Sequence, residues 1–274
     1  NYDFESFEGW GTWWTSWHDF DDKTFLGCTG PWTGDDIINI ILEQDECAIH
    51  ISKKIYKWFV YDIPDLDFIN GMADVLRSNN YEIKPVLQYL FTSEYFYDPI
   101  FIGSNIQNPI QLYLGSLKRF QMESQPFDDN FFTEIQSHLN MILFEPPDVN
   151  GWLGYRSWIN SNTLPLRKAM LCAFIDHTSP FGSFGNYINI PSIAESFINE
   201  DDDTLPIIQI IDNLSFLLLG VPINEMSKEQ LLMIALNGAE PYDWDLNLPA
   251  HNAQWNRFED LLRYIMRLPE FQLS

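Results

Sequence analysis

Apolar side chains recur at helical spacing through most of this 274-residue chain, and this periodicity constrains the fold more than any other feature. From about residue 35 onward they return every three or four positions, which places them along one face of a helix. Sustained strand-like alternation is missing after the first 30 residues. The sequence therefore predicts a mainly α, multi-helix globular protein with a small irregular or β-like portion at its amino end.

Helix-start signals and apolar runs give the order of the expected helices. They begin near Asp35, Glu46, Asp65, Glu82, Pro109 and Phe131, and after one interruption near Asn160, Ile207, Ser227 and Trp255. The residues expected to face the core include Ile37, Ile38, Ile41 and Leu42 in the first helix, Ile51, Ile55, Trp58 and Phe59 in the second, Leu66 in the third and Ile142 in the sixth. Residues 178–191 are rich in Ser, Pro, Gly and Asn, which indicates a loop.

The length of 274 residues suits one large domain or two small ones with a substantial core, and we expect residues 1–274 to form a single domain. No internal repeat of fixed period divides it. Its expected parts are an irregular Trp/Asp-rich segment at 1–34, a first helical part at 35–144, a signature loop at 145–160 and a second helical part at 161–274.

The charge balance excludes some classes of partner. Lys and Arg number 15 and Asp and Glu 39, so the formal charge is 15 − 39 = −24. Binding to nucleic-acid phosphates needs the opposite sign, and the same repulsion disfavours anionic lipid. The charge is typical of an extracellular or surface-exposed protein, and clustered carboxylates that bind a divalent cation are the alternative. No run of 18 apolar residues predicts a membrane span.

Aromatic and cysteine content gives two further expectations. Aromatic residues make up 16% of the chain, more than a core of this size usually uses, so some rings should be exposed to a glycan or a partner. Cys28 and Cys47 could pair in an oxidising compartment, whereas Cys172 lies in an apolar run and is expected in the core. The chain opens on Asn1 and not on Met, so it reads as a mature or fragmentary product whose targeting segment could have been lost.

A histidine and several carboxylates near the amino end form the candidate metal site, which comprises His18, Asp19, Asp35 and Asp36. Such side chains are ligands for Zn²⁺, Mn²⁺ or Ca²⁺. Their spacing matches no defined metal motif, and Asp side chains also cap helices and form turns. The sequence leaves two readings, a divalent-cation site or a segment of local caps and turns.

Residues 144–160 have a composition that ordinary helix or strand packing does not produce. The candidate binding or structural residues in this stretch and just downstream are Pro146, Pro147, Asp148, Asn150, Gly151, Trp152, Gly154, Arg156, Trp158, Asn160 and Arg167. One reading is a rigid, buried loop between two helical halves, with the tryptophans as packing anchors. The other is a recognition platform of aromatic faces beside Arg156. We also expect this loop to lie close to the amino-terminal His/Asp segment.

Three stretches together resemble one family. They are His18-Asp-Phe-Asp-Asp-Lys-Thr-Phe-Leu-Gly27 with Gly34-Asp-Asp-Ile-Ile38, Leu90-Phe-Thr-Ser-Glu-Tyr-Phe96 with Asn108-Pro109, and Pro146-Pro-Asp-Val-Asn-Gly-Trp-Leu-Gly-Tyr-Arg-Ser-Trp-Ile-Asn160 with Arg167 downstream. Their order and spacing resemble the domain-of-unknown-function 1800 (DUF1800) family over nearly the whole chain. Leu153 and Tyr155 stand where that family often has proline and glycine, which affects the fine geometry of the loop.

The resemblance implies an exported bacterial protein, Bacteroidetes-like in its composition, that corresponds to the carboxy-terminal two-thirds of the family domain. Such proteins are often encoded beside a domain-of-unknown-function 1501 (DUF1501) partner, which resembles the alkaline phosphatase and sulfatase group. The family supplies no agreed activity and no agreed catalytic residues, so the resemblance assigns neither to this chain.

We therefore expect an exported, non-catalytic binding or scaffold subunit with a protein partner, located in the periplasm, at the cell surface or outside the cell. One alternative is a metal-assisted hydrolase, or an accessory subunit of a phosphatase- or sulfatase-like partner, with the His/Asp segment as its metal site. Another is a carbohydrate-binding protein that uses exposed Trp side chains.

Overall fold

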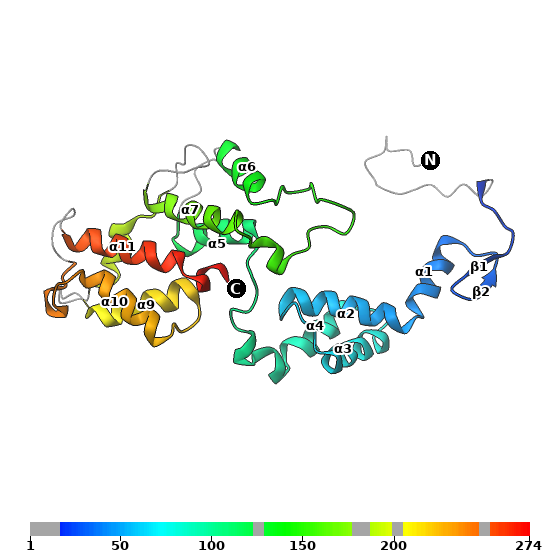
Figure 1. Cartoon of the computed structure of the whole chain (residues 1–274). Coiled ribbons are helices and arrows are strands. Elements are labelled where there is room, and N and C mark those ends of the chain that lie inside the picture. Colours follow the sequence, from blue (N-terminus) through cyan, green and yellow to red (C-terminus); the bar gives the residue numbers. More distant parts are fainter. Residues whose placement is uncertain (1–16, 123–128, 177–186, 199–204, 247–252) are drawn as a thin grey trace. The chain divides into compact units, whose positions relative to one another are not determined.

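The computed structural model describes residues 17–122, 129–176, 187–198, 205–246 and 253–274. Within these ranges it contains 11 α-helices, several short 3-10 helices and one two-stranded sheet, which confirms the prediction of a mainly α protein (Figure 1). The chain divides into two compact units. Unit 1 comprises residues 1–59 and 63–96, and unit 2 comprises residues 60–62 and 97–274. The prediction of a single domain stays a prediction.

Unit 1 begins, in its described part, with a small hairpin. Strands β1 (Lys23–Phe25) and β2 (Cys28–Gly30) are antiparallel. The two residues of the turn, Leu26 and Gly27, both have a positive φ, as a type I′ hairpin turn requires. The hydroxyls of Thr24 and Thr29, which are paired across the strands, lie 2.9 Å apart. The β-like portion expected near the amino end is thus present.

Four α-helices follow the hairpin in unit 1. They are α1 (Gly34–Leu42), α2 (Asp45–Phe59), α3 (Leu66–Ser78) and α4 (Ile83–Phe91), followed by the 3-10 helix η2 (Glu94–Tyr97). Helix α3 packs against both α2 and α4. In their shared core, Tyr56 is fully buried and its hydroxyl lies 2.8 Å from that of Tyr95. The ring of Phe68 stacks on Tyr95 with 4.2 Å between centroids.

The buried faces of α1 and α2 differ from the expected ones. In α1 only Ile40 is buried, whereas Ile38 and Ile41 are exposed. In α2 the buried residues are Ala48, Ser52 and Tyr56, and Trp58 is 71% exposed. The expected face was chosen by hydrophobicity alone, whereas the close approach of α3 favours the small side chains of Ala48 and Ser52. The prediction that Trp58 and Phe59 face the core was wrong, and Leu66 at the start of α3 is also exposed.

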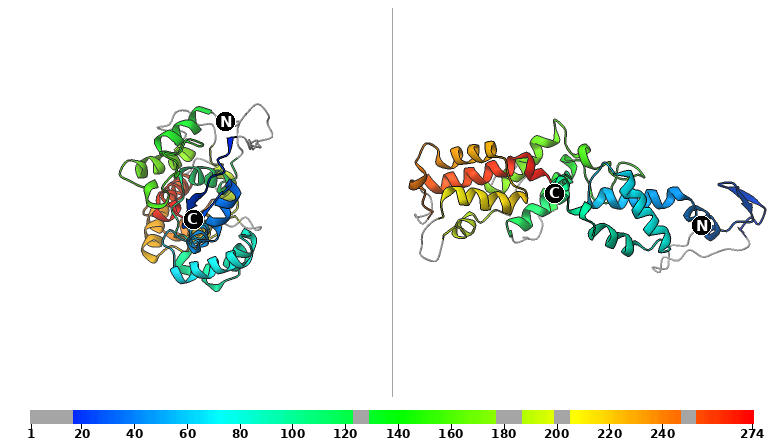
Figure 2. Two further views of the ribbon diagram at one scale, coloured as in Figure 1. Left: turned by 90° about the vertical axis from the view of Figure 1, so that its right-hand side faces the viewer. Right: turned by 90° about the horizontal axis from the view of Figure 1, so that it is seen from below.

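Unit 2 contains the remaining helices, seven α and four 3-10. They are η3 (Pro99–Phe101), α5 (Pro109–Arg119), α6 (Asp129–His138), η4 (Tyr155–Trp158), α7 (Thr163–Asp176), α8 (Ile190–Glu195), α9 (Ile207–Leu219), α10 (Glu225–Leu236), η5 (Pro241–Asp243), α11 (Ala253–Arg267) and η6 (Pro269–Gln272). Helix α11 packs against α7, α9 and α10, and the second view of Figure 2 shows α9, α10 and α11 lying side by side. One hydrophobic core joins these helices to α5 and α6.

Some helix boundaries in unit 2 were predicted well. Asn108 and Pro109 cap α5 as expected, because the Asn108 side chain accepts from the Gln111 amide and the Gln111 side chain accepts from the Asn108 amide. Helix α10 begins earlier than expected. Its cap is Asn224, which accepts from the Ser227 amide, so the helix begins at Glu225 and not at the expected Ser227.

Two other boundaries in unit 2 differ from expectation. Helix α6 ends at His138 because Asn140 adopts a left-handed φ of 59°, so Ile142 lies beyond the helix and is exposed. Helix α8 lies partly within the loop expected at 178–191, of which residues 178–186 fall outside the described ranges. Its cap is Asn189 and its first residues include a proline, but six residues are too few for a clear periodic signal.

The longest described helices, α2 and α11, have 15 residues each, and none of the described helices has the length and apolar character needed to cross a bilayer. All three cysteines are free, and Cys172 is buried in α7 as expected. The structure therefore contains no bond between Cys28 and Cys47.

Candidate functional site

The candidate metal-ligating residues are engaged in local structure. The Asp19 carboxylate accepts from the Asp21 amide at 2.9 Å and lies 3.8 Å from the Lys23 ammonium. The Asp36 carboxylate accepts from both the amide and the hydroxyl of Thr33, at 2.8 and 2.6 Å, and these bonds hold the pKa of Asp36 below its usual value. Together Thr33 and Asp36 form a capping box at the start of α1.

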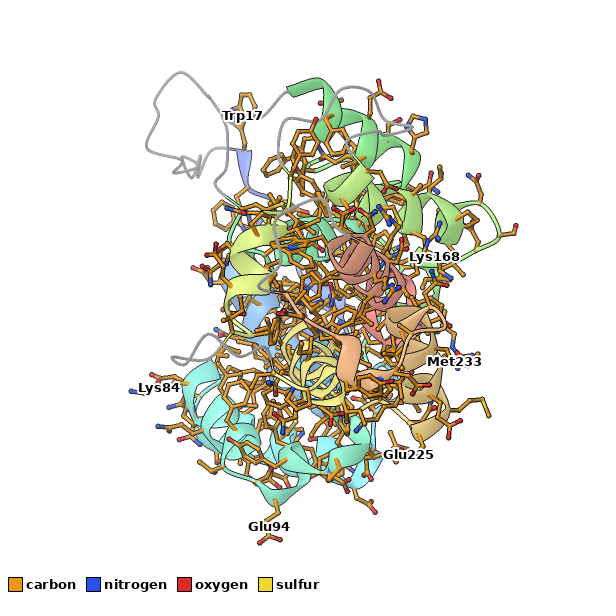
Figure 3. The ribbon with its side chains drawn as sticks, turned by 90° about the vertical axis from the view of Figure 1, so that its left-hand side faces the viewer. Trp17, Lys84, Glu94, Lys168, Glu225 and Met233 are labelled. Atoms are coloured by element: carbon orange, nitrogen blue, oxygen red, sulfur yellow. The ribbon has the colours of Figure 1, made fainter. Side chains whose placement is uncertain are left out.

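No group of three or more His, Cys, Asp or Glu side chains in the described ranges is arranged to hold a metal ion. Within the candidate segment, the ring of His18 meets Phe20 edge to face with 4.7 Å between centroids. Its neighbour Trp17 is 74% exposed and extends away from the ribbon in Figure 3. The geometry of this segment therefore favours the reading of local caps and turns, and the divalent-cation site gains no support from it.

The signature loop starts with a well-defined turn after α6. The Gln136 side chain accepts from the Leu143 amide at 2.8 Å, and the Glu145 amide donates to the Ile142 carbonyl at 3.1 Å. Between them Phe144 adopts a φ of 67°, in the left-handed region that a phenylalanine rarely occupies. The backbone of this turn is thus fixed by hydrogen bonds although one of its residues is strained.

The middle of the loop is organised by Asp148 and two glycines. The Asp148 carboxylate accepts from the Asn150 amide at 2.7 Å, and the Asp148 carbonyl accepts from the Gly151 amide at 3.1 Å. Gly151 and Gly154 have φ angles of 84° and 75°, which explains why glycine occupies both positions.

The end of the loop is anchored to the helical body of unit 2. Trp158 is buried, and its carbonyl accepts from the Thr163 hydroxyl at 2.9 Å. The Asn160 side chain accepts from the amides of Asn162 and Thr163, both at 2.8 Å, and so organises the turn that leads into α7. The Tyr155 hydroxyl lies 3.0 Å from that of Tyr61, and this hydrogen bond raises the pKa of Tyr61.

Most of the loop before this anchor is exposed. Phe144 is 94%, Val149 103% and Leu153 88% exposed, and Pro146, Pro147 and Asp148 are exposed as well. Trp152 is only half-buried, so Trp158 is the one tryptophan of the two that packs fully. The interpretation of a buried loop therefore holds for its last residues alone.

Arg156 and Arg167, the two candidate arginines, have different surroundings. The exposed Arg156 guanidinium lies over the Tyr155 ring, 5.5 Å from its centroid, and forms no ion pair with any residue in the described ranges. Arg167 on α7 is fully buried and donates to the Gln272 side chain and the Gln107 carbonyl, both at 2.7 Å. Burial lowers the pKa of Arg167 to about 10.

The Arg167 contacts belong to a set of hydrogen bonds that joins residues 272–274 to the segment before α5. Ile106 and Leu273 form an antiparallel bridge, and the Gln107 amide donates to the Gln272 carbonyl at 2.9 Å. The amide of Ser274 donates to the Asn105 carbonyl at 2.8 Å. We conclude that Arg167 supports the fold and does not take part in a surface site.

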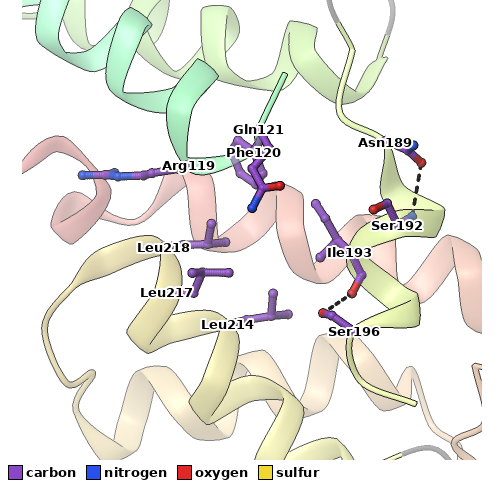
Figure 4. Close-up of a pocket in the computed structure, with 10 residues that line it drawn as sticks. All are labelled: Arg119, Phe120, Gln121, Asn189, Ser192, Ile193, Ser196, Leu214, Leu217 and Leu218. Carbon is purple, nitrogen blue, oxygen red and sulfur yellow. Dashed lines mark hydrogen bonds between the residues drawn. The ribbon is translucent and has the colours of Figure 1, made fainter. Parts of the chain in front are cut away.

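A cavity of about 320 Å³ lies between the end of α5, α8 and α9. Leu214 and Leu218 supply apolar walls, and Figure 4 shows Gln121 extending into the space from the end of α5 and Ser192 and Ile193 lining it from α8. The Arg119 guanidinium points away and lies 5.1 Å from the Phe271 ring centroid. Sequence reasoning missed this cavity because its walls come from three segments far apart in the chain.

The expected proximity of the signature loop and the amino-terminal His/Asp segment stays a prediction, because the two segments belong to different units. Searches of curated proteins and of solved structures gave no match to the chain. The family model for DUF1800, described as a protein of unknown function, matches residues 8–273. That match covers nearly the whole sequence, so this chain belongs to the DUF1800 family.

Proposed function

We propose that this protein is an exported, non-catalytic binding or scaffold subunit, and that residues 142–156, which comprise the turn after α6 and most of the signature loop, form its recognition loop. The observation that carries the proposal is the near-complete exposure of Phe144, Val149 and Leu153 on a backbone fixed by local hydrogen bonds. Exposed apolar side chains are common singly, but three large ones within ten residues form a group that is typical of binding surfaces.

The rigid backbone of the recognition loop favours binding. Association requires that mobile groups become ordered, and this entropic cost lowers affinity. Here the turns around Phe144 and Val149 are already held by the Gln136 and Asp148 side chains. Little of the free energy gained by burying apolar surface against a partner is therefore lost to ordering the loop backbone.

The neighbouring charges indicate the chemistry of the partner. Glu145 and Asp148 are exposed beside the apolar side chains. The fitting surface is an apolar pocket edged by Lys or Arg, which is a common form of protein interface. We therefore propose a protein partner, and the DUF1501 protein implied by the family resemblance is the first candidate.

The expected contribution of the recognition loop is large. Full burial of a Phe, Val or Leu side chain is worth roughly 1.5–3 kcal/mol. Changing Phe144, Val149 and Leu153 together to serine should weaken binding by at least about fortyfold, even if only half of that energy is realised. The same change should leave the fold intact, because these side chains have almost no packing contacts to lose.

The test uses site-specific photo-crosslinking in the producing organism. A benzophenone amino acid replaces Phe144, and in a control chain it replaces Met233, which is 74% exposed on α10 and labelled in Figure 3. We expect one discrete protein adduct from position 144 that is absent from position 233. Excess unmodified chain should suppress the adduct, and excess triple-serine variant should not.

Three outcomes would contradict the proposal. Adducts that are identical at positions 144 and 233 would show non-specific contact, and competition by the triple-serine variant would show that the apolar side chains do not matter. Flotation of the purified chain with phosphatidylcholine vesicles, lost in the triple-serine variant, would replace the protein partner by a lipid surface.

A further inference from the structure

One face of helix α2 concentrates positive charge in an otherwise acidic protein. The chain has 15 Lys and Arg against 39 Asp and Glu, yet Lys53, Lys54 and Lys57 lie within five consecutive residues. A helix turns by about 100° per residue, so the side chains of Lys53, Lys57, His50, Lys54 and Trp58 span an arc of about 140° in that order. Ala48, Ser52 and Tyr56, which pack in the core of unit 1, lie on the opposite side of the helix.

Helix stability alone does not account for this arrangement. Like charges three and four residues apart, as in the pairs Lys54–Lys57 and Lys53–Lys57, destabilise a helix. Lys53 and Lys54 form no ion pair with any residue in the described ranges that would offset this. A lysine in the last turn of a helix interacts favourably with the helix dipole, but of the three only Lys57 lies there. The one acidic side chain on this face is Glu46, in the first turn.

Trp58 gives the face a second recognition element. It lies four residues after Lys54, one helical turn further along the same face, and is 71% exposed. An exposed indole offers a flat apolar surface against which the ring of a sugar can stack, while neighbouring ammonium groups bind carboxylates. Flexible acidic peptides match the ammonium groups but have no ring to place on the indole.

We infer that the face of α2 formed by His50, Lys53, Lys54 and Trp58 binds an acidic polysaccharide of the uronate type. The net charge of −24 does not prevent this contact, because at about 0.15 M salt electrostatic interactions are screened beyond about 8 Å. The site lies in unit 1, whereas the recognition loop lies in unit 2, so this inference does not depend on the proposed function.

The test measures binding of the full chain to polygalacturonic acid at about 0.15 M salt, with dextran as the neutral polymer and polyglutamate as the acidic polypeptide. The variants are Lys53→Gln/Lys54→Gln and Trp58→Ala. The matched control is Lys84→Gln, because Lys84 is an exposed lysine on α4 of the same unit and points outward in Figure 3. Circular dichroism checks that every variant retains its helical content.

We expect binding to polygalacturonic acid and not to dextran. The double lysine variant should bind at least about tenfold more weakly, since it loses two of the charge contacts. Trp58→Ala should weaken binding to polygalacturonic acid about fivefold, which is typical of a lost ring contact, and Lys84→Gln should bind like the wild type.

Several results would overturn the inference. Equal binding to dextran would remove the role of charge, and unchanged binding by the double lysine variant would remove α2 as the site. If polyglutamate binds as tightly as polygalacturonic acid and Trp58→Ala has no effect on either, the face recognises polyanions in general and not a sugar.

Discussion

Replacing Phe144 by glycine tests whether this residue serves recognition or stability. Phe144 adopts a φ of 67°, and the left-handed conformation costs a non-glycine residue roughly 1–2 kcal/mol. Glycine removes this strain, but it loses about 0.5–1 kcal/mol more backbone entropy on folding. The lost burial is close to zero because the side chain is 94% exposed. The Phe144→Gly variant should therefore be more stable than the wild type by about 0.5–1 kcal/mol.

A matched variant isolates the strain. Val149 is fully exposed in the same loop, and its φ is not positive, so Val149→Gly should lose the entropy without gaining any relief. In urea denaturation followed by tryptophan fluorescence, the free energy of unfolding of Phe144→Gly should exceed that of Val149→Gly by about 1–2 kcal/mol. This difference equals the cost of the left-handed conformation at Phe144. In a thermal scan Phe144→Gly should raise the unfolding temperature by about 1–4 °C.

The opposite order of stability would refute this reasoning. If Phe144→Gly is less stable than Val149→Gly, the phenyl ring packs against something in solution, and its exposure is not evidence for recognition. If Phe144→Gly is more stable and also binds the partner more weakly, the strain is retained at a cost in stability because the ring is needed for binding.

Three further predictions follow from other parts of the structure. Arg167→Met should lower the free energy of unfolding by about 3 kcal/mol in urea denaturation, since it leaves the Gln272 side chain and the Gln107 carbonyl without their buried donor. Arg167→Lys should restore little of the lost stability, because one ammonium replaces a planar pair of donors. Burial raises the pKa of Tyr113 to about 12, so the hydroxyl loses its proton at lower pH in the unfolded chain than in the folded one. About 2 kcal/mol of the free energy of unfolding, present below pH 10, should therefore be lost as the pH rises from 10 to 12. Tyr113→Phe should flatten that pH dependence. Asp36→Ala should lower the stability of unit 1 in urea denaturation through loss of the capping box, and by the same amount with and without EDTA; a loss seen only without EDTA would restore the metal reading.

The sequence predicts the helices of this protein better than their buried faces. Capping residues such as Asp65 and Asn108 are local signals, and the structure confirms both. The buried face of a helix depends on what packs against it. In α2 the apolar residues cover about half of the helix circumference. Contact with α3 buries Ala48 and Ser52 and leaves Trp58 exposed. That selection cannot be read from α2 alone.

The sequence locates the candidate site along the chain but does not show which of its residues are buried. Prolines, glycines and tryptophans mark residues 145–160 as irregular, yet the same residues suit a buried loop and an exposed one. Only the structure separates Trp158, which is buried, from Val149, which is fully exposed. The cavity beside α8 gave no sequence signal, because Gln121, Ser192 and Leu214 are brought together by tertiary packing.

The bridge between Ile106 and Leu273 also sets the order in which unit 2 can fold during synthesis. The Gln107 side chain donates to the carbonyl of Leu273, which is 166 residues further along the chain. At about 5–20 residues per second, a ribosome needs roughly 8–33 s to make that stretch. Once made, α5 and α7 wait for the rest of this interval without the segment that fixes their polar contacts, and Arg167 lacks its partner Gln272. Unit 2 can therefore complete these contacts only after residues 272–274 have left the ribosome.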